Sequence, residues 1–177
     1  MSRCARLLAC TVPVGVGAYL DERNRIRSEA WPTLTRKGTE AFEALETVLK
    51  GLEIPLPAGH GVADKDGNPR QHIRTRWWNT QRLSYRELAI VPPEVISQIP
   101  HTPAPDDILP GYKGDKPLFV GHYWMTGEPE SLTAHIACLD YSIAGQNKES
   151  ATPGKLCAYR LDKERELQKG KFIWVNG

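Results

Sequence analysis

The sequence predicts a mixed α+β fold, and three patterns along the chain support this. Between Thr39 and Gly51, acidic residues come early, a lysine comes late and apolar residues recur every three or four positions, as in a surface helix. The turn-forming residues Asp64 to Pro69 precede an alternating stretch, which indicates a hairpin. After residue 117, short apolar runs alternate with glycine-containing and polar connections. These runs predict a set of short strands.

The composition indicates one folded unit. The chain has 177 residues, of which 40% are hydrophobic, enough to bury a core. The formal net charge of +2 does not indicate a polyanionic partner, but five arginines and no acidic residue lie between Arg70 and Arg86. No apolar stretch is long enough to span a membrane. We therefore expect a single domain over residues 1–177, with no membrane partner.

The first 34 residues form a divergent segment that allows two interpretations. Two arginines precede the apolar stretch 7–20, and Val16-Gly17-Ala18 could serve as a small-residue cleavage site, as in a secretory signal. However, Pro13 interrupts the stretch, so the alternative is a core strand from Leu7 to Thr11 in a cytoplasmic protein. We expect the cytoplasmic location.

Residues 35–90 are predicted to contain the helix and the hairpin. Thr39 is placed to cap the helix and Gly51 to end it. Before it, Pro32 favours an extended Trp31. The residues expected to form one buried stripe are Phe42, Leu45, Leu49 and Leu52.

After the turn, residues 71–78 are predicted to form a strand with two different faces. One face would carry Ile73, Thr75 and Trp77, and the other His72, Arg74, Arg76 and Trp78. Arg74 and Arg76 would then project together from one side. They would form either a solvated basic surface or a site for phosphate or nucleic acid, because guanidinium groups beside aromatic rings suit such ligands.

The last two zones are a loop and a set of strands. Half of the 14 prolines fall in residues 91–117, which predicts a long, stiff loop without regular helix or sheet. Residues 118–177 are predicted to form a β meander. Its expected strands are Leu118–Trp124, His135–Ile143, Leu156–Leu161 and Phe172–Val175.

His122 is the candidate metal ligand of the chain. An apolar run delivers Gly121 and His122 to a strand end, where glycine permits close backbone approach and the imidazole can leave the sheet. One histidine makes no metal site, because a divalent ion needs at least three protein ligands. The other histidines have no metal-binding neighbours in sequence. Cys138 and Cys157 are expected to be buried free thiols, or a disulfide if they face each other on neighbouring strands.

Several motifs in register resemble a known family. They are Leu49 to Pro57, the Asp64-Lys65-Asp66-Gly67 turn, Arg76-Trp77-Trp78, Gly121-His122-Tyr123-Trp124, Cys138-Leu139-Asp140-Tyr141-Ser142 and Ala158-Tyr159-Arg160. In this order the chain is similar to the carboxy-terminal half of the calcineurin-like metallophosphoesterases. The resemblance covers roughly residues 35 to 175.

The resemblance implies part of an α-β-β-α sandwich that binds two divalent ions of manganese, iron or zinc and hydrolyses a phosphoester. His122 matches the family's last histidine ligand. Gly121, Tyr123, Trp124 and Asp140 would support the site or shape its wall. The family's Asp-x-His, Gly-Asp-x-x-Asp and Gly-Asn-His motifs, which supply most ligands, do not occur here.

Two functions follow from this resemblance and its gap. The first is a phosphoesterase fragment, which alone is inactive and can lack bound metal until a chain with the missing motifs complements it. The second is a binding module. The binding module would use the basic Arg70–Arg86 segment for phosphate or nucleic acid, and no metal would be involved.

Overall fold

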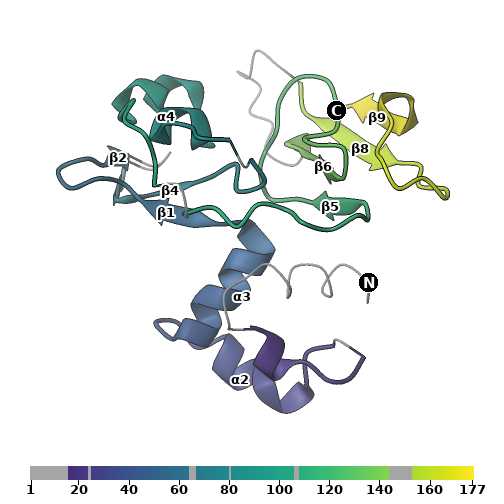
Figure 1. The fold of residues 1–177 in the computed structure, drawn as a ribbon, viewed down its shortest axis with the longest axis horizontal. Coiled ribbons are helices and arrows are strands. Elements are labelled where there is room, and N and C mark those ends of the chain that lie inside the picture. The colour runs from purple at the N-terminus through teal and green to yellow at the C-terminus, as the bar shows by residue number, and fades with distance from the viewer. Residues whose placement is uncertain (1–15, 24, 64–66, 80, 106–107, 144–152) are drawn as a thin grey trace.

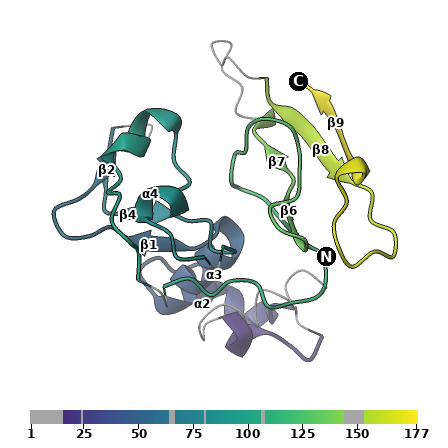
Figure 2. The same cartoon turned by 45° about the horizontal axis from the view of Figure 1, so that its top comes forward.

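The computed structural model describes residues 16–23, 25–63, 67–79, 81–105, 108–143 and 153–177. Helices and short strands both occur, which confirms the mixed α+β class. Helices α2 and α3 lie on one side of the layer that holds the strands, as Figure 1 shows. In Figure 2, the strands before residue 75 and those after residue 135 stand on opposite sides of the view. The strand predicted at Leu7–Thr11 lies outside the described residues.

The helical part contains two short 3₁₀ segments and two α-helices. They are η1 (Val16–Tyr19), η2 (Ser28–Ala30), α2 (Trp31–Leu34) and α3 (Glu40–Lys50). Helix α3 begins and ends as predicted. The hydroxyl of Thr39 accepts a hydrogen bond from the Phe42 N–H at 3.2 Å, and Gly51 ends the helix with a φ of 94°.

The buried face of α3 differs from the predicted stripe. Ala41 and Leu45 pack on Ala30 and Leu34, whereas Leu49 is 59% exposed. The reason is that α2 and its neighbours cover only the first half of α3. Trp31 is also not extended. It begins α2 in the right-handed helical region, and Pro32 is tolerated in the first turn because its position needs no N–H donor.

The central part holds two antiparallel strand pairs and a short helix. Strand β1 (Glu53–Pro55) pairs with β4 (His72–Arg74), and β2 (Val62–Ala63) pairs with β3 (Pro69–Arg70). A hairpin is therefore present, but its second strand is Pro69–Arg70, whereas the strand predicted after the turn, here β4, pairs with β1. Helix α4 (Tyr85–Leu88) begins with a capping box between Ser84 and Glu87. Apolar side chains from both pairs and from α4 form one core.

The basic strand is shorter than predicted. Strand β4 ends at Arg74, and Thr75 makes only an isolated bridge to Ala89. Ile73, Thr75 and Trp77 are buried as the alternation predicts. Trp78 is buried as well, which the two-face pattern did not predict, because the chain turns at residues 77–78 and no longer alternates.

The proline-rich residues 91–117 contain no strand in the described part, but the prediction that they lack helix was wrong. Segment η3 (Pro93–Gln98) is a 3₁₀ helix of six residues that begins with a proline. Proline suits the first turn of a helix because that position needs no N–H donor.

The terminal strands form two sheets, and only one is a meander. Strand β5 (Leu118–Val120) runs parallel to β6 (Ile136–Cys138), which corrects the predicted meander for this pair. Strands β7 (Asp140–Tyr141), β8 (Lys155–Tyr159) and β9 (Phe172–Asn176) are antiparallel in that order. A parallel pair needs a long crossover, which here is the loop after β5 that carries His122. The described strands form four small sheets, so the sandwich architecture stays a prediction.

A half-buried ion pair lies in the connection between β8 and β9. The Lys171 ammonium lies 2.8 Å from one carboxylate oxygen of Glu164, and the Tyr159 hydroxyl donates to the other at 3.0 Å. The side chain of Glu164 is only 9% exposed. The hydrogen bond from Lys171 is the largest of the effects that hold the pKa of Glu164 at about 2, below its ordinary value of 4.5.

We predict that replacing Glu164→Gln lowers the stability of the protein at pH 7 and removes part of its acid sensitivity. A carboxylate with a lowered pKa stabilises the fold above the ordinary value of 4.5 and loses this effect as the pH falls toward 2. Urea unfolding between pH 2 and pH 7 checks this. Glu166→Gln, on the same connection, serves as the control. A wild-type and a variant protein with parallel pH profiles would contradict the prediction.

Candidate functional site

The candidate site is the loop that follows β5, and its backbone is strained. His122 and Trp124 have positive φ angles of 68° and 52°, and Ser142, after β7, has 63°. These are all the non-glycine residues with positive φ in the part of the chain that the structure describes. Each such residue costs of the order of 1–3 kcal/mol, and such residues cluster where a function depends on the conformation. Contacts with the rest of the chain must therefore stabilise the backbone at His122 and Trp124, after β5, and at Ser142, after β7.

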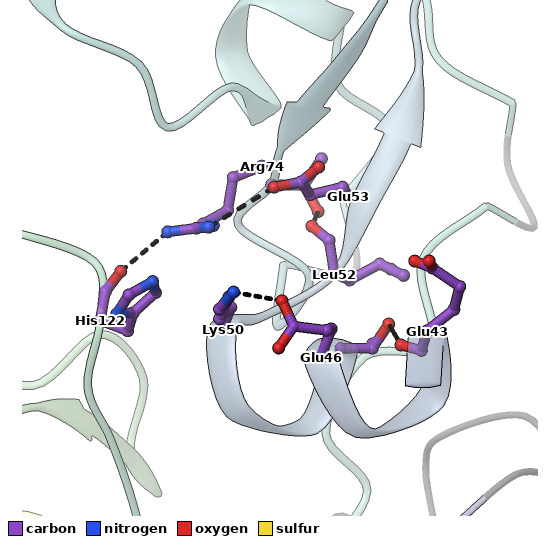
Figure 3. A network of polar contacts seen from close by, with 9 residues as sticks. Glu43, Glu46, Lys50, Leu52, Glu53, Arg74 and His122 are labelled. Carbon is purple, nitrogen blue, oxygen red and sulfur yellow. Dashed lines mark hydrogen bonds and ion pairs between the residues drawn. The ribbon is translucent and has the colours of Figure 1, made fainter. Parts of the chain in front are cut away.

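Arg74 holds the loop at His122. One terminal nitrogen of its guanidinium donates to the His122 carbonyl at 2.8 Å, and the other lies 3.4 Å from a carboxylate oxygen of Glu53 (Figure 3). The guanidinium carbon is 6.0 Å from the centre of the Tyr123 ring, within cation–π range. The Nε atom of Arg74 is buried and has no hydrogen-bond partner. The guanidinium of Arg74 therefore contacts His122 and Tyr123 of the loop and does not project into solvent.

Tyr123 anchors the loop in the core. Its hydroxyl accepts a hydrogen bond from the Trp77 indole N–H at 2.8 Å, and its ring makes an edge contact with Trp78. Burial raises the pKa of Tyr123 to about 12, so the phenol is neutral at pH 7. Tyr123 is only 5% exposed, so in this chain it has a structural role, and its predicted place in a site wall stays a prediction.

Asp140 holds the loop from the other side. One carboxylate oxygen accepts the Trp124 N–H at 3.3 Å, and the other accepts the Ser142 N–H at 3.1 Å. Its carbonyl accepts the Met125 N–H at 3.0 Å. Asp140 therefore links the two strained loops, which fits the predicted supporting role. In contrast, Gly121 is not needed for close approach, because an added Cβ would meet only the Asp140 Cβ, at an ordinary 3.9 Å.

His122 and Trp124 are the exposed members of the loop. His122 is exposed, and Trp124 is 54% exposed. Among the described residues, no group of three or more His, Cys, Asp or Glu side chains lies close enough together to hold a metal ion. His122 alone does not fit a metal centre, so the metal stays a prediction about a completed site.

The two arginines predicted to act together do not share a role. The Arg74 side chain is 22% exposed and points to the loop, whereas Arg76 is exposed and its backbone N–H bonds to the Leu88 carbonyl. Sequence patterns showed Arg74 on a polar strand face but could not show its partner, which follows 48 residues later. The role of Trp77 as donor to Tyr123 was also missed. No local signal identifies a contact across 46 residues.

The remaining candidates have ordinary roles. Cys138 and Cys157 are free thiols, so the disulfide alternative was wrong, and burial raises the pKa of Cys138 to about 11. His60, His72 and His101 are exposed. The Nδ1 atom of His135 lies 3.0 Å from the Arg165 carbonyl.

Comparison with known proteins adds no relative. No protein-family model matches the chain, and no curated protein or solved structure matches it significantly.

We predict that Gly51→Ala destabilises the protein by about 3 kcal/mol, compared with about 1 kcal/mol for Gly38→Ala. Both glycines have positive φ, but a Cβ at Gly51 would lie 2.0 Å from the Tyr123 hydroxyl oxygen, whereas one at Gly38 would meet nothing within 4 Å. The clash would displace Tyr123 from Trp77. Denaturant unfolding of the two variants measures the difference, and equal losses would show that Tyr123 does not pack as described.

Proposed function

We propose that this chain is the carboxy-terminal part of a calcineurin-like phosphoesterase sandwich, that it supplies His122 as one metal ligand, and that it is inactive alone. The observation that carries the proposal is an exposed imidazole on a strained loop held by Arg74, Tyr123 and Asp140. Strain is expected to persist where a side chain must be displayed in one position. The motifs that resemble the family contain this loop and Asp140.

The proposed chemistry needs groups from outside this chain. In the completed site, two divalent ions of manganese, iron or zinc would activate a water molecule and neutralise the charge of a phosphoester substrate. His122 would hold one ion through a ring nitrogen. Trp124 would border the site, and Asp140 would keep Trp124 and Ser142 in place through their N–H groups.

An exposed apolar sheet face supports the need for a complementing chain. On the β8–β9 pair, Leu156 lies opposite Val175, and Ala158 lies opposite Ile173. Leu156, Ile173 and Val175 are 57–61% exposed. Four neighbouring apolar side chains on one face of a sheet are typical of a surface that packs against another layer. In the proposed sandwich, strands with the missing motifs would provide that layer.

The basic segment Arg70–Arg86 gives some support to the second function, a binding module for phosphate or nucleic acid. Arg76 is exposed and could bind a phosphate or nucleic-acid ligand without any metal. Arg74, the other predicted contact, is engaged with the His122 carbonyl and Glu53, so this surface offers less free charge than the sequence suggested. As for membranes, none of the helices in the described ranges is long and apolar enough to cross one.

We predict that the folded, isolated chain does not hydrolyse an aryl phosphate with Mn²⁺ and holds no stoichiometric metal. One histidine cannot provide the ligands of a two-metal site. Hydrolysis assays, metal analysis and circular dichroism on the same sample check this, with His122→Ala as the matched variant. Hydrolysis that disappears in His122→Ala would show that the chain completes its own site and would contradict the proposed incompleteness.

Complementation tests the phosphoesterase assignment itself. The chain is mixed with the amino-terminal half of a calcineurin-like phosphoesterase that carries the three missing motifs. We expect Mn²⁺-dependent hydrolysis that His122→Ala abolishes. If neither this half nor a product of the upstream coding sequence restores activity, the assignment fails. Binding to a polyanion that weakens steeply with salt and is lost in Arg76→Ala would favour the second function.

A further inference from the structure

We infer that Arg74 is a positioning residue for His122. Arg74 holds His122 in the left-handed conformation by donating a hydrogen bond to the carbonyl of the peptide group between His122 and Tyr123. The importance of this positioning for catalysis rests on the proposed role of His122 as a metal ligand. The structural part of the inference rests only on contacts within this chain.

The first argument is the polarity of the groups that meet the loop. The carbonyl before Tyr123 accepts from the cation of Arg74 at 2.8 Å, and the N–H after Tyr123 donates to the anion of Asp140 at 3.3 Å. A positive group thus faces the negative end of one peptide group, and a negative group faces the positive end of the next. Hydrogen bonds to charged partners are the stronger kind, so this pair can hold an otherwise unfavourable backbone.

The second argument is how Arg74 distributes its donors. Its contact with His122 is 2.8 Å, whereas its contact with Glu53 is 3.4 Å and the Glu53 side chain is 51% exposed. An exposed ion pair of this kind contributes little. The buried Nε atom of Arg74 has no hydrogen-bond partner, so the position of the side chain leaves one of its donors unsatisfied. The short hydrogen bond to the His122 carbonyl is therefore the main polar contact of Arg74.

The third argument is the order of elements in space. Arg74 is the last residue of β4, and its guanidinium reaches from β4 to the loop after β5, as Figure 3 shows. The Tyr123 ring lies beneath the guanidinium and is itself fixed by Trp77. Through Arg74, the strand pair β1–β4 therefore holds the loop that contains His122.

The experiment is NMR of the isotopically labelled 177-residue chain, with the Cα and Cβ chemical shifts of His122 as the readout, since these report its backbone conformation. The variants are Arg74→Met, Arg74→Lys, Glu53→Gln and Arg76→Met. We expect Arg74→Met to move the His122 shifts away from left-handed values. Arg74→Lys, which retains one charged donor, should restore them in part. Glu53→Gln and the control Arg76→Met should leave them unchanged.

Two results would overturn the inference. One is a folded Arg74→Met protein that keeps left-handed shifts at His122. The other is a Glu53→Gln protein whose shifts move as far as those of Arg74→Lys, which would assign the effect to the ion pair; this comparison holds even if Arg74→Met does not fold. In the complemented complex, Arg74→Met should raise the Mn²⁺ concentration for half-maximal hydrolysis about tenfold, because an imidazole that is held less firmly in position binds the metal more weakly. An unchanged Mn²⁺ requirement would deny the catalytic importance of Arg74.

The two proposals can fail separately. The NMR measurement needs no metal, so it can reject the positioning role while complementation still succeeds. If complementation fails, the NMR result still decides whether Arg74 sets the conformation of His122.

Discussion

The burial of Tyr123 is the interaction on which the arrangement of this protein depends. Its ring belongs to an apolar cluster that joins Trp77 and Trp78, from the central part, to Leu118 and Ile136, from the terminal strands. The indole of Trp77 satisfies the one polar atom of the side chain. A buried hydroxyl without a partner would cost about 1–3 kcal/mol. This hydrogen bond therefore lets an aromatic ring unite two parts of the chain that are otherwise separate in sequence.

The position of Tyr123 determines what its neighbours can do. Because the side chain points into the core, the residues on either side, His122 and Trp124, must turn outward, and both adopt positive φ. An alternating strand would instead place them opposite Tyr123 without strain, but the strand has already ended at Val120. The charged residues Arg74 and Asp140 meet the peptide groups around Tyr123. Their charges hold the backbone, which leaves less charge for a ligand.

This arrangement also separates the two functional interpretations. A phosphate-binding surface needs exposed, unpaired guanidinium groups, and Arg74 does not provide one. In the loop after β5, the His122 side chain is exposed, while Arg74 and Asp140 bond to the peptide groups on either side of Tyr123. The described residues place no further ligand beside His122. Within the described residues, His122 is therefore not part of a complete metal centre.

The sequence by itself determined the features that depend on nearby residues. Thr39 and Gly51 set the limits of α3, because capping and left-handed termination involve only residues within one turn. The turn-forming sequence after Ala63 similarly lies between two strands that pair with each other. The alternation before Trp77 identified which residues are buried. It failed at Trp78, because the chain bends there.

Only the tertiary structure decided the features that join distant segments. These features are the parallel pairing of β5 with β6, the packing against the first half of α3 and the contact from Arg74 to His122. Each joins segments that are far apart in the sequence, so local residue propensities do not predict it. His122 could be singled out from its motif, but the residues that hold it come from β4 and β7. Hydrogen bonds across 16 and 48 residues form only when packing brings those segments together.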